Sequence, residues 1–183
     1  MLDNLRYLHP IGGAPQYYRK TQSIGDLILQ ASEGFEYVAQ FRGIQILIDG
    51  CSLETLPSLA LDSDAMSTTF FNLIDNAVKF SDDNEPVNIT GQSDGSSCTI
   101  TITNRGSGIP PEDLDRIFTP YYRTGAVLPT PGCGIGLTVA KYIIEAHLGT
   151  INVTCQDSER KGNSQTSLVT FTVNLPLSQE EGS

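Results

Sequence analysis

Two neighbouring segments, residues 87–94 and 96–104, alternate apolar and polar residues and meet at the dipeptide Asp94-Gly95. Aspartate followed by glycine between two alternating runs is a strong signal for a β-hairpin with a tight turn. Each strand of such a hairpin has one apolar face and one polar face. The apolar face needs a cover, so the rest of the chain is expected to supply helices to one side of an antiparallel sheet.

The helices that this sheet needs can be recognised on either side of the hairpin. Apolar residues recur at three- and four-residue steps from Ser23, a good N-cap, to Gly43, a typical stop, which predicts one helix. A second helix is expected from Asp62 or Ser63 to about Phe80. The remaining expected elements are a strand at 44–49, a loop with some extended character at 51–59, a helical turn at 112–118, a loop without periodicity at 121–134, a helix at 136–149, and strands at 150–156 and 167–177. This order predicts an α+β two-layer sandwich, in which a mixed, largely antiparallel sheet carries helices on one face.

Length and charge restrict the class of protein. The chain has 183 residues, the length of one domain, and its net charge of −10, with no basic patch, argues against nucleic acid and anionic membrane as partners. No apolar run reaches the roughly 18 residues that a membrane-spanning helix needs. Four scattered cysteines without metal-ligand spacing predict reduced thiols and a cytoplasmic location. We expect 1–19 to be the remnant of an upstream helix plus a linker, 20–177 to be the folded domain, and 178–183 to be a disordered tail.

The predicted helix ending at Phe80 carries an unusual polar stripe. Asn72 and Asn76 are four residues apart, and Lys79 follows three residues later, so all three side chains share one face. Such a stripe either faces solvent or lines a pocket for phosphate oxygens and a hydrated cation. An asparagine carbonyl is a suitable oxygen ligand for Mg²⁺.

Two glycine-rich segments follow at strand and helix ends. Asn104 precedes Gly106 and Gly108, which either make a tight turn or let the backbone approach a planar ligand closely. The segment 132–137, GCGIGL, stands directly before a helix, where backbone amides point outward and suit a phosphate. Its spacing is neither that of a P-loop nor that of a dinucleotide-binding turn, and a simple glycine hinge is the alternative.

The order of these segments resembles that of a known family. NLIDNAVKF (72–80), NRGSGIP (104–110), RIFTPYYR (116–123) and GCGIGL (132–137) are similar to the N box, first glycine box, F box and second glycine box of the catalytic, ATP-binding domain of sensor histidine kinases. That family shares a superfamily with gyrase, mismatch-repair ATPases and the large heat-shock chaperone. The resemblance covers roughly residues 20–177 and implies the Bergerat-type ATP-binding fold.

The resemblance implies roles for individual residues. Asn76 would coordinate the Mg²⁺ of Mg-ATP, and Asn72, Lys79 and Arg123 would form the catalytic set at the phosphates. Residues 119–131 would form a lid over the nucleotide. The positions implied to contact the nucleotide are Asn72, Asn76, Lys79, Phe80, Asn104, Gly106, Gly108, Ile109, Tyr122, Gly132, Gly134, Ile135, Gly136 and Leu137.

Two positions refine this resemblance. Hydrolysing relatives have a water-activating glutamate where this chain has Asn72, so the chain resembles the kinases rather than the hydrolases. The family usually has aspartate at the position of Asn104, where a carboxylate accepts from the adenine amino group. An amide can accept or donate, so selectivity for adenine over guanine is open at this position.

The phosphoacceptor is expected outside this chain. His9 lies in a Pro/Gly-rich segment, and His147 lies where the family commonly has a non-catalytic histidine. The implied function is therefore that of a protein histidine kinase catalytic domain in two-component signal transduction. Its implied partners are a histidine-bearing helix of the same or another chain and a response regulator, with dimerisation only through upstream helices. The alternatives are a serine kinase of the anti-sigma type and a non-catalytic nucleotide-binding signalling module.

Overall fold

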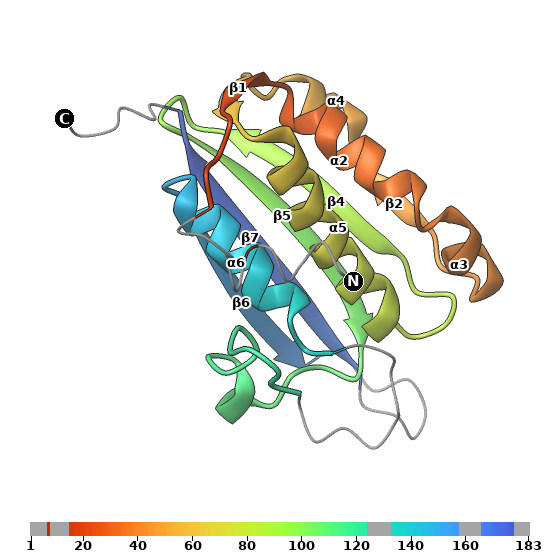
Figure 1. Cartoon of the computed structure of the whole chain (residues 1–183). Helices are drawn as coiled ribbons and strands as arrows, with labels where there is room; N and C mark the ends of the chain where they lie inside the picture. The colour runs from red at the N-terminus through yellow and green to blue at the C-terminus, as the bar shows by residue number, and fades with distance from the viewer. Residues whose placement is uncertain (1–6, 8–14, 124–132, 158–165, 178–183) are drawn as a thin grey trace.

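A five-stranded sheet carries helices on one face (Figure 1). The computed structural model describes residue 7 and residues 15–123, 133–157 and 166–177. The strand order is β2-β4-β5-β7-β6, formed by Ile46–Ile48, Val87–Ser93, Ser97–Gly106, Ser167–Pro176 and Thr150–Asp157. Only the pair of β2 and β4 is parallel among these strands, and the other three pairs are antiparallel. The predicted mixed, largely antiparallel sheet is confirmed.

Three helices cover this face of the sheet. They are α2 (Ile24–Glu33), α5 (Ser63–Phe80) and α6 (Gly136–Ala146), and α5 packs against both of the others (Figure 1). The shorter elements are β1 (Lys20–Gln22), α3 (Glu36–Phe41), α4 (Gly50–Glu54), β3 (Leu59–Leu61) and the 3-10 helix η1 (Pro111–Asp113). The α+β two-layer sandwich expected from the sequence is therefore the architecture observed.

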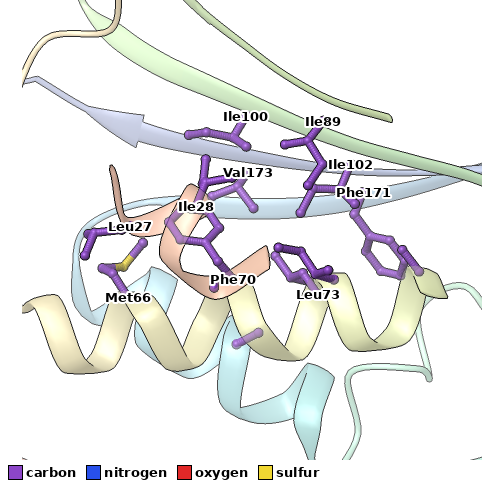
Figure 2. Packing of buried hydrophobic residues seen from close by; sticks show 14 of the residues in the cluster. Leu27, Ile28, Met66, Phe70, Leu73, Ile89, Ile100, Ile102, Phe171 and Val173 are labelled. Atoms are coloured by element: carbon purple, nitrogen blue, oxygen red, sulfur yellow. The ribbon is translucent and has the colours of Figure 1, made fainter. Parts of the chain in front are cut away.

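The core lies between α5 and the middle of the sheet. Figure 2 shows Phe70 and Leu73 of α5 facing Ile100, Ile102 and Phe171, all of them fully buried. Burial alternates along β5 and β7, so every second side chain points toward the helices. Full burial of each such side chain contributes about 1.5–3 kcal/mol, which makes this alternation the main reason for the sheet's register.

The predicted hairpin between β4 and β5 is confirmed. Gly95 takes a positive φ of 84°, as the turn requires. The carboxylate of Asp94 accepts hydrogen bonds of 2.8 Å from the backbone N–H groups of both Ser96 and Ser97. These bonds favour the ionised form and lower the pKa of Asp94 to about 2.

The single helix predicted over 23–43 is wrong, because the chain forms α2 and α3 with a break at Gly34. Glycine is a poor helix former, and here it is the C-cap of α2. Phe35 then turns inward and packs its ring 4.6 Å from that of Phe71. The predicted start and stop are confirmed, since Ser23 accepts from the N–H of Asp26 and Gly43 has a φ of 67°.

Three further boundaries differ from the prediction. Residues 51–59 were expected to form a loop, but most of α4 lies there, because the Asp49 side chain caps it by accepting from Ser52 N–H. Lys20–Gln22 pairs with Leu59–Leu61 as a separate two-stranded sheet, a long-range pairing that no local pattern announces. The last helix ends at Ala146 and not at Gly149, since Leu148 adopts a positive φ of 60°.

Parts of the sequence-based domain assignment lie outside the described residues. These are most of the expected upstream remnant and linker at 1–19 and the expected tail at 178–183. Tyr7 is described, and it is buried with its ring stacked 6.4 Å from that of Tyr17.

Candidate nucleotide site

The two polar residues at the centre of the predicted site lie on α5, which begins at its cap Asp62. Asn72 is 8% exposed and Asn76 is half-buried, so neither side chain points freely into solvent. Asn72 faces the start of α6: a Cβ atom on Gly136 would lie 3.2 Å from Asn72 Oδ1. The structure therefore brings the asparagine stripe against the second glycine segment, as the resemblance requires.

The beginning of α6 has no side-chain cap. Its N-cap, Ile135, supplies no side-chain cap hydrogen bond, so the first-turn N–H groups receive no acceptor from a capping side chain. Ile135 is buried and Leu137 is half-buried, which gives this turn an apolar base. An uncapped helix start beside the Asn72 amide suits an anion such as a phosphate.

The other end of α5 meets the end of β5. Ser81 forms an isolated antiparallel bridge with Gly106, and Asp82 N–H donates to the carbonyl of Arg105 at 2.8 Å. A Cβ atom on Gly106 would lie 1.8 Å from the carbonyl oxygen of Phe80. The close approach predicted at Gly106 is therefore made by the chain's own backbone at Phe80, a residue that is itself 38% exposed.

An arginine that the sequence reasoning missed holds this end of α5. The guanidinium of Arg42 donates to the carbonyls of Val78 (2.7 Å) and Ser81 and to the carboxylate of Asp83 (2.8 Å). Carbonyls at a helix C-terminus lack helical partners and carry partial negative charge, so a cation is favourable there. Arg42 comes 30 or more residues before these partners, and no motif links the two segments.

Gly108 and Ile109 lie against β6 and β7. Gly108 has a φ of 73°, and a Cβ there would lie 2.6 Å from Ser167 Oγ. The N–H of Ile109 donates to Cys155 Sγ at 3.3 Å. A groove of about 390 Å³ opens beside this turn, lined by Ser107, Gly108, Ile109, Pro110, Pro111, Cys155, Asp157 and Ser167. No α5 residue lines it, so this groove lies beside the asparagine stripe and not within it.

The described first part of the expected lid, residues 119–123, is tied to the second glycine segment. Tyr121 N–H donates to the carbonyl of Gly134 at 2.9 Å, and a Cβ on Gly134 would lie 2.8 Å from the carbonyl of Tyr122. The Tyr122 hydroxyl donates to the carboxylate of Asp113, which raises the pKa of Tyr122, and the Arg116 guanidinium lies 4.4 Å from the centre of its ring. Sequence reasoning did not find Asp113 or Arg116. Gly132 and residues 124–131 of the lid lie outside the described part.

The two charged residues of the predicted catalytic set, Lys79 and Arg123, differ in their contacts. Lys79 Nζ donates to Asp75 one turn earlier on α5, an ion pair that the sequence shows only as a spacing. Arg123 is exposed and is the last described residue of the expected lid segment before Gly132. Asn104, by contrast, is 2% exposed and its Nδ2 has no hydrogen-bond partner in the described part of the chain. Such an orphaned amide, together with the uncapped start of α6, fits a bound nucleotide better than a self-contained core.

His147 has a structural contact. Its ring is fully buried, its Nε2 lies 3.1 Å from the N–H of Asp62, and its Nδ1 lies 2.8 Å from the carbonyl of Ile143. The N–H of Asp62 can only donate, so Nε2 accepts and Nδ1 carries the proton. A histidine held in this way between α5 and α6 fits the non-catalytic assignment made from the sequence.

Comparison with known proteins shows the family of the chain. Residues 61–179 match the family described as histidine kinase-, DNA gyrase B- and HSP90-like ATPases. The chain belongs to that family. Within it, the sensor histidine kinase ZraS of Escherichia coli K12 is 37% identical over 124 residues, covering 68% of this chain and 24% of ZraS.

Solved structures of histidine kinases share the fold. The mycobacterial sensor histidine kinase MprB superposes with a TM-score of 0.71 at 24% identity, covering 86% of this chain and 97% of that one. Histidine kinase ThkA in complex with the response regulator TrrA has a TM-score of 0.68 at 22% identity, covering 90% of this chain and 43% of that one. The chain spans about a quarter of the length of ZraS, so it corresponds to the ATPase domain of a sensor histidine kinase. Among the described helices, none combines the length and apolar character that crossing a bilayer demands.

Proposed function

We propose that this chain binds Mg-ATP and transfers the γ-phosphoryl group to a histidine that lies outside it, as the catalytic domain of a sensor histidine kinase. The observation that carries the proposal is the contact between the Asn72 amide and Gly136 at the uncapped start of α6. This contact between an amide side chain and a helix start supports the proposal, because a metal-bound triphosphate needs both oxygen ligands and backbone N–H donors.

Each side chain would have a limited task. The backbone amides of Gly134 and of the first turn of α6 from Gly136 onward would hold phosphate oxygens. The Asn76 side-chain oxygen would bind Mg²⁺, and Asn72 would orient the same region. Phosphoryl transfer depends mainly on positioning and charge stabilisation, so this set needs no strong base. Asn72 carries no carboxylate to activate water, which favours transfer over hydrolysis.

Lys79 and Arg123 would contact the phosphates in different ways. Lys79 is already paired with Asp75, so a bound phosphate would share the ammonium with that carboxylate. Arg123 stands at the edge of the lid segment and would reach the γ-phosphate when the lid closes. The bound magnesium would supply charge neutralisation at the phosphate oxygens.

The partners and place of the reaction belong to this proposal. ThkA, a structural neighbour, was solved in complex with the response regulator TrrA, which supports a response regulator as the eventual acceptor here. The four scattered cysteines, all of them free thiols, support a domain that works in the cytoplasm. The histidine-bearing helix would come from an upstream segment or from another chain.

Titration calorimetry of the 183-residue chain with ATP, with and without Mg²⁺, tests the binding step. We expect saturable, Mg²⁺-dependent binding in the micromolar to millimolar range, and Asn76→Ala should weaken it at least about tenfold because an oxygen ligand is lost. Asn88→Ala is the matched control, since Asn88 is exposed on β4. No Mg²⁺-dependent binding would refute the proposal.

A transfer assay separates the three candidate functions. The chain is mixed with γ-labelled ATP and a two-helix fragment carrying a phosphoacceptor histidine. Acid-labile, base-stable label on the fragment is the result expected for a histidine kinase. Acid-stable label on a serine of a partner would favour the anti-sigma type of kinase, and binding without any transfer would favour the non-catalytic module.

A further inference from the structure

The strand β6 forms one edge of the five-stranded sheet. It pairs with β7 on one side, and none of the described strands lies along its other side. In an antiparallel edge strand, every second residue directs its backbone N–H and C=O groups outward. Among the described residues, no strand takes up the outward groups of Thr150–Asp157. A row of this kind is a template on which a further strand can pair.

The two edges of the sheet differ in how well they are protected. β2, at the opposite edge, is only three residues long, and a short edge strand offers little to a partner. β6 has eight residues with neither proline nor lysine, and its one charged residue, Asp157, stands at its end. Proteins normally protect a long edge with such residues, so this edge suits the addition of a strand.

The side chains of β6 alternate between two different surroundings. Ile151 is buried under the helices, and Val153 and Cys155 on the same face are partly buried. The side chains of the opposite face are exposed, polar and uncharged, and they belong to Thr150, Asn152, Thr154 and Gln156. A strand that extends the sheet at this edge therefore has to place apolar residues on the helix-covered face and polar residues on the open face.

A second copy of this chain meets that requirement, because β6 is complementary to itself. Two identical strands pair antiparallel about a twofold axis perpendicular to the sheet, and each side chain then meets one on the same face. Since side chains alternate between the faces, the axis passes through a residue. With the axis at Val153, Ile151 of one copy meets Cys155 of the other. In the same register Asn152 meets Thr154, so polar groups meet on the open face.

The distribution of charge favours this occupant and this register. Two copies of a chain with a net charge of −10 repel each other, so they can only meet through an uncharged part of the surface. Residues 150–156 carry no charge. With the axis at Val153, Asp157 lies opposite Gly149 of the other copy, whereas an axis one residue later would set this carboxylate against the buried Ile151.

We infer that two copies of this domain associate by antiparallel pairing of β6 about Val153, which joins two sheets of five strands into one continuous sheet. The pairing forms about six to eight backbone hydrogen bonds. A single edge buries a small area, so the dimer is weak and reversible. This interface does not depend on nucleotide binding, and it is separate from the upstream helices through which dimerisation was expected.

Sedimentation velocity of the 183-residue chain over a range of concentrations tests the association. A like-charge variant, Asn152→Lys with Thr154→Lys, opposes two positive charges at two places across the axis and should weaken the dimer at least about tenfold. An opposite-charge variant, Asn152→Lys with Thr154→Glu, puts unlike charges at the same two places and should restore it.

The matched control is Asn88→Lys with Thr90→Lys. These two residues have the same types, spacing and exposure as the pair on β6, but β4 lies inside the sheet with a strand on each side. The control therefore adds the same positive charge away from the edge, and it should dimerise at least as well as the unmodified chain. Thermal melting checks that each variant is folded.

Amide hydrogen exchange of the unmodified chain gives a second measurement that needs no variant. When the protein concentration is raised, protection should increase within residues 150–156 and stay unchanged within Val87–Ser93 of β4. If the variants do not fold, an increase confined to β6 supports the inference, and exchange in β6 that is independent of concentration overturns it.

The sedimentation results support the inference when the like-charge variant loses the dimer and the opposite-charge variant and the control keep it. A chain that is monomeric at every concentration overturns it, and would leave the edge to a strand of another protein. A dimer that is unaffected by the like-charge variant, or weakened equally by the control, also overturns it. A dimer that the opposite-charge variant does not restore overturns the register about Val153.

Discussion

At one end of β5, Asp94 accepts hydrogen bonds from the backbone of Ser96 and Ser97, and the turn satisfies its own polar groups. At the other end, the buried Asn104 amide has an N–H₂ group with no partner in the described chain, and Gly106 is held by contact with the distant Phe80. The first end is built from residues four positions apart or fewer. The second end depends on α5 and β7, and it leaves hydrogen-bonding capacity unused. The difference separates a local structural turn from a site that a ligand completes.

The largest expected loss of stability comes from a substitution at the second end of β5. Gly106→Ala would place a methyl group 1.8 Å from the carbonyl oxygen of Phe80, and neither backbone segment can move without breaking the Ser81–Gly106 bridge. We expect a loss of about 3 kcal/mol or more in the free energy of unfolding. Urea denaturation measures it, and Gly50→Ala is the control, because a Cβ on Gly50 meets nothing within 4 Å. Equal stability of the two variants would contradict the contact.

The next largest loss of stability is expected from replacing Arg42, which holds the C-terminal end of α5. Arg42→Met keeps the apolar stem but loses the hydrogen bonds to Val78, Ser81 and Asp83. Charged hydrogen bonds of this kind contribute about 1.5–3 kcal/mol, so the free energy of unfolding should fall by about 2 kcal/mol. Lys20→Met, at an exposed position of β1, is the matched loss of a positive charge and should change stability little. A fall of the same size in both variants would show a general charge effect.

A smaller effect is a pH dependence of stability caused by His147, which is buried between α5 and α6. Burial lowers the pKa of His147 below its ordinary value of 6.5, and the positive charge of Arg19 lowers it further. The carbonyl of Ile143 and the carboxylate of Asp62 raise this pKa, but their effect is smaller. The unfolded chain therefore binds a proton more readily than the folded chain. Stability from this residue is complete above about pH 6.5 and is lost as pH falls toward the lower folded pKa.

Chemical denaturation between pH 7.5 and about pH 5.5 measures this loss. His147→Gln cannot titrate, so its stability should change less over the same interval, although it is less stable at pH 7.5. Parallel curves for the two proteins would contradict the assignment of this pH dependence to His147.

The smallest effect concerns the self-contained turn. Asp94→Ala removes the acceptor for Ser96 and Ser97, and we expect a drop of a few degrees at most in the melting temperature, since the carboxylate is fully exposed. Because the folded pKa is about 2 and lies below the ordinary value of 3.8 for an aspartate, this stabilisation is present above pH 4 and disappears as pH falls toward 2. The difference between the two proteins in thermal melts should shrink over that interval, and nucleotide affinity should be unchanged.

Local signals accounted for much of the fold. Ser23 and Asp62 cap the helices that were expected to begin there, and Asp94-Gly95 turns the predicted hairpin. Each of these depends on a side chain and a backbone group two or three residues apart, so a short stretch of sequence contains both partners. The break at Gly34 was missed because it depends on Phe35 packing against Phe71, a contact between distant segments.

The residues of the candidate site also fall into two groups, those predicted from the sequence and those that only the folded structure brings together. The spacing of Asn72 and Asn76 and the two glycine segments, with the family resemblance that they carry, predict a nucleotide site. The support given by Arg42 and the hydrogen bond from Tyr122 to Asp113 were not predicted, since Arg42 and Asp113 lie outside the motifs. Lys79 was expected to face phosphate, and its ion pair with Asp75 became clear only when both side chains were placed.

By itself, the sequence determined the alternation of the sheet strands, the caps and turns, and the family to which the site belongs, because periodicity and short-range hydrogen bonds operate within a few residues. The tertiary structure decided which glycines are obligatory and which polar groups lack partners. Gly106 is required by the carbonyl of Phe80, and Asn104 is left unpaired by Ile102 and Val169. Such properties depend on distances between segments that only the folded chain brings together.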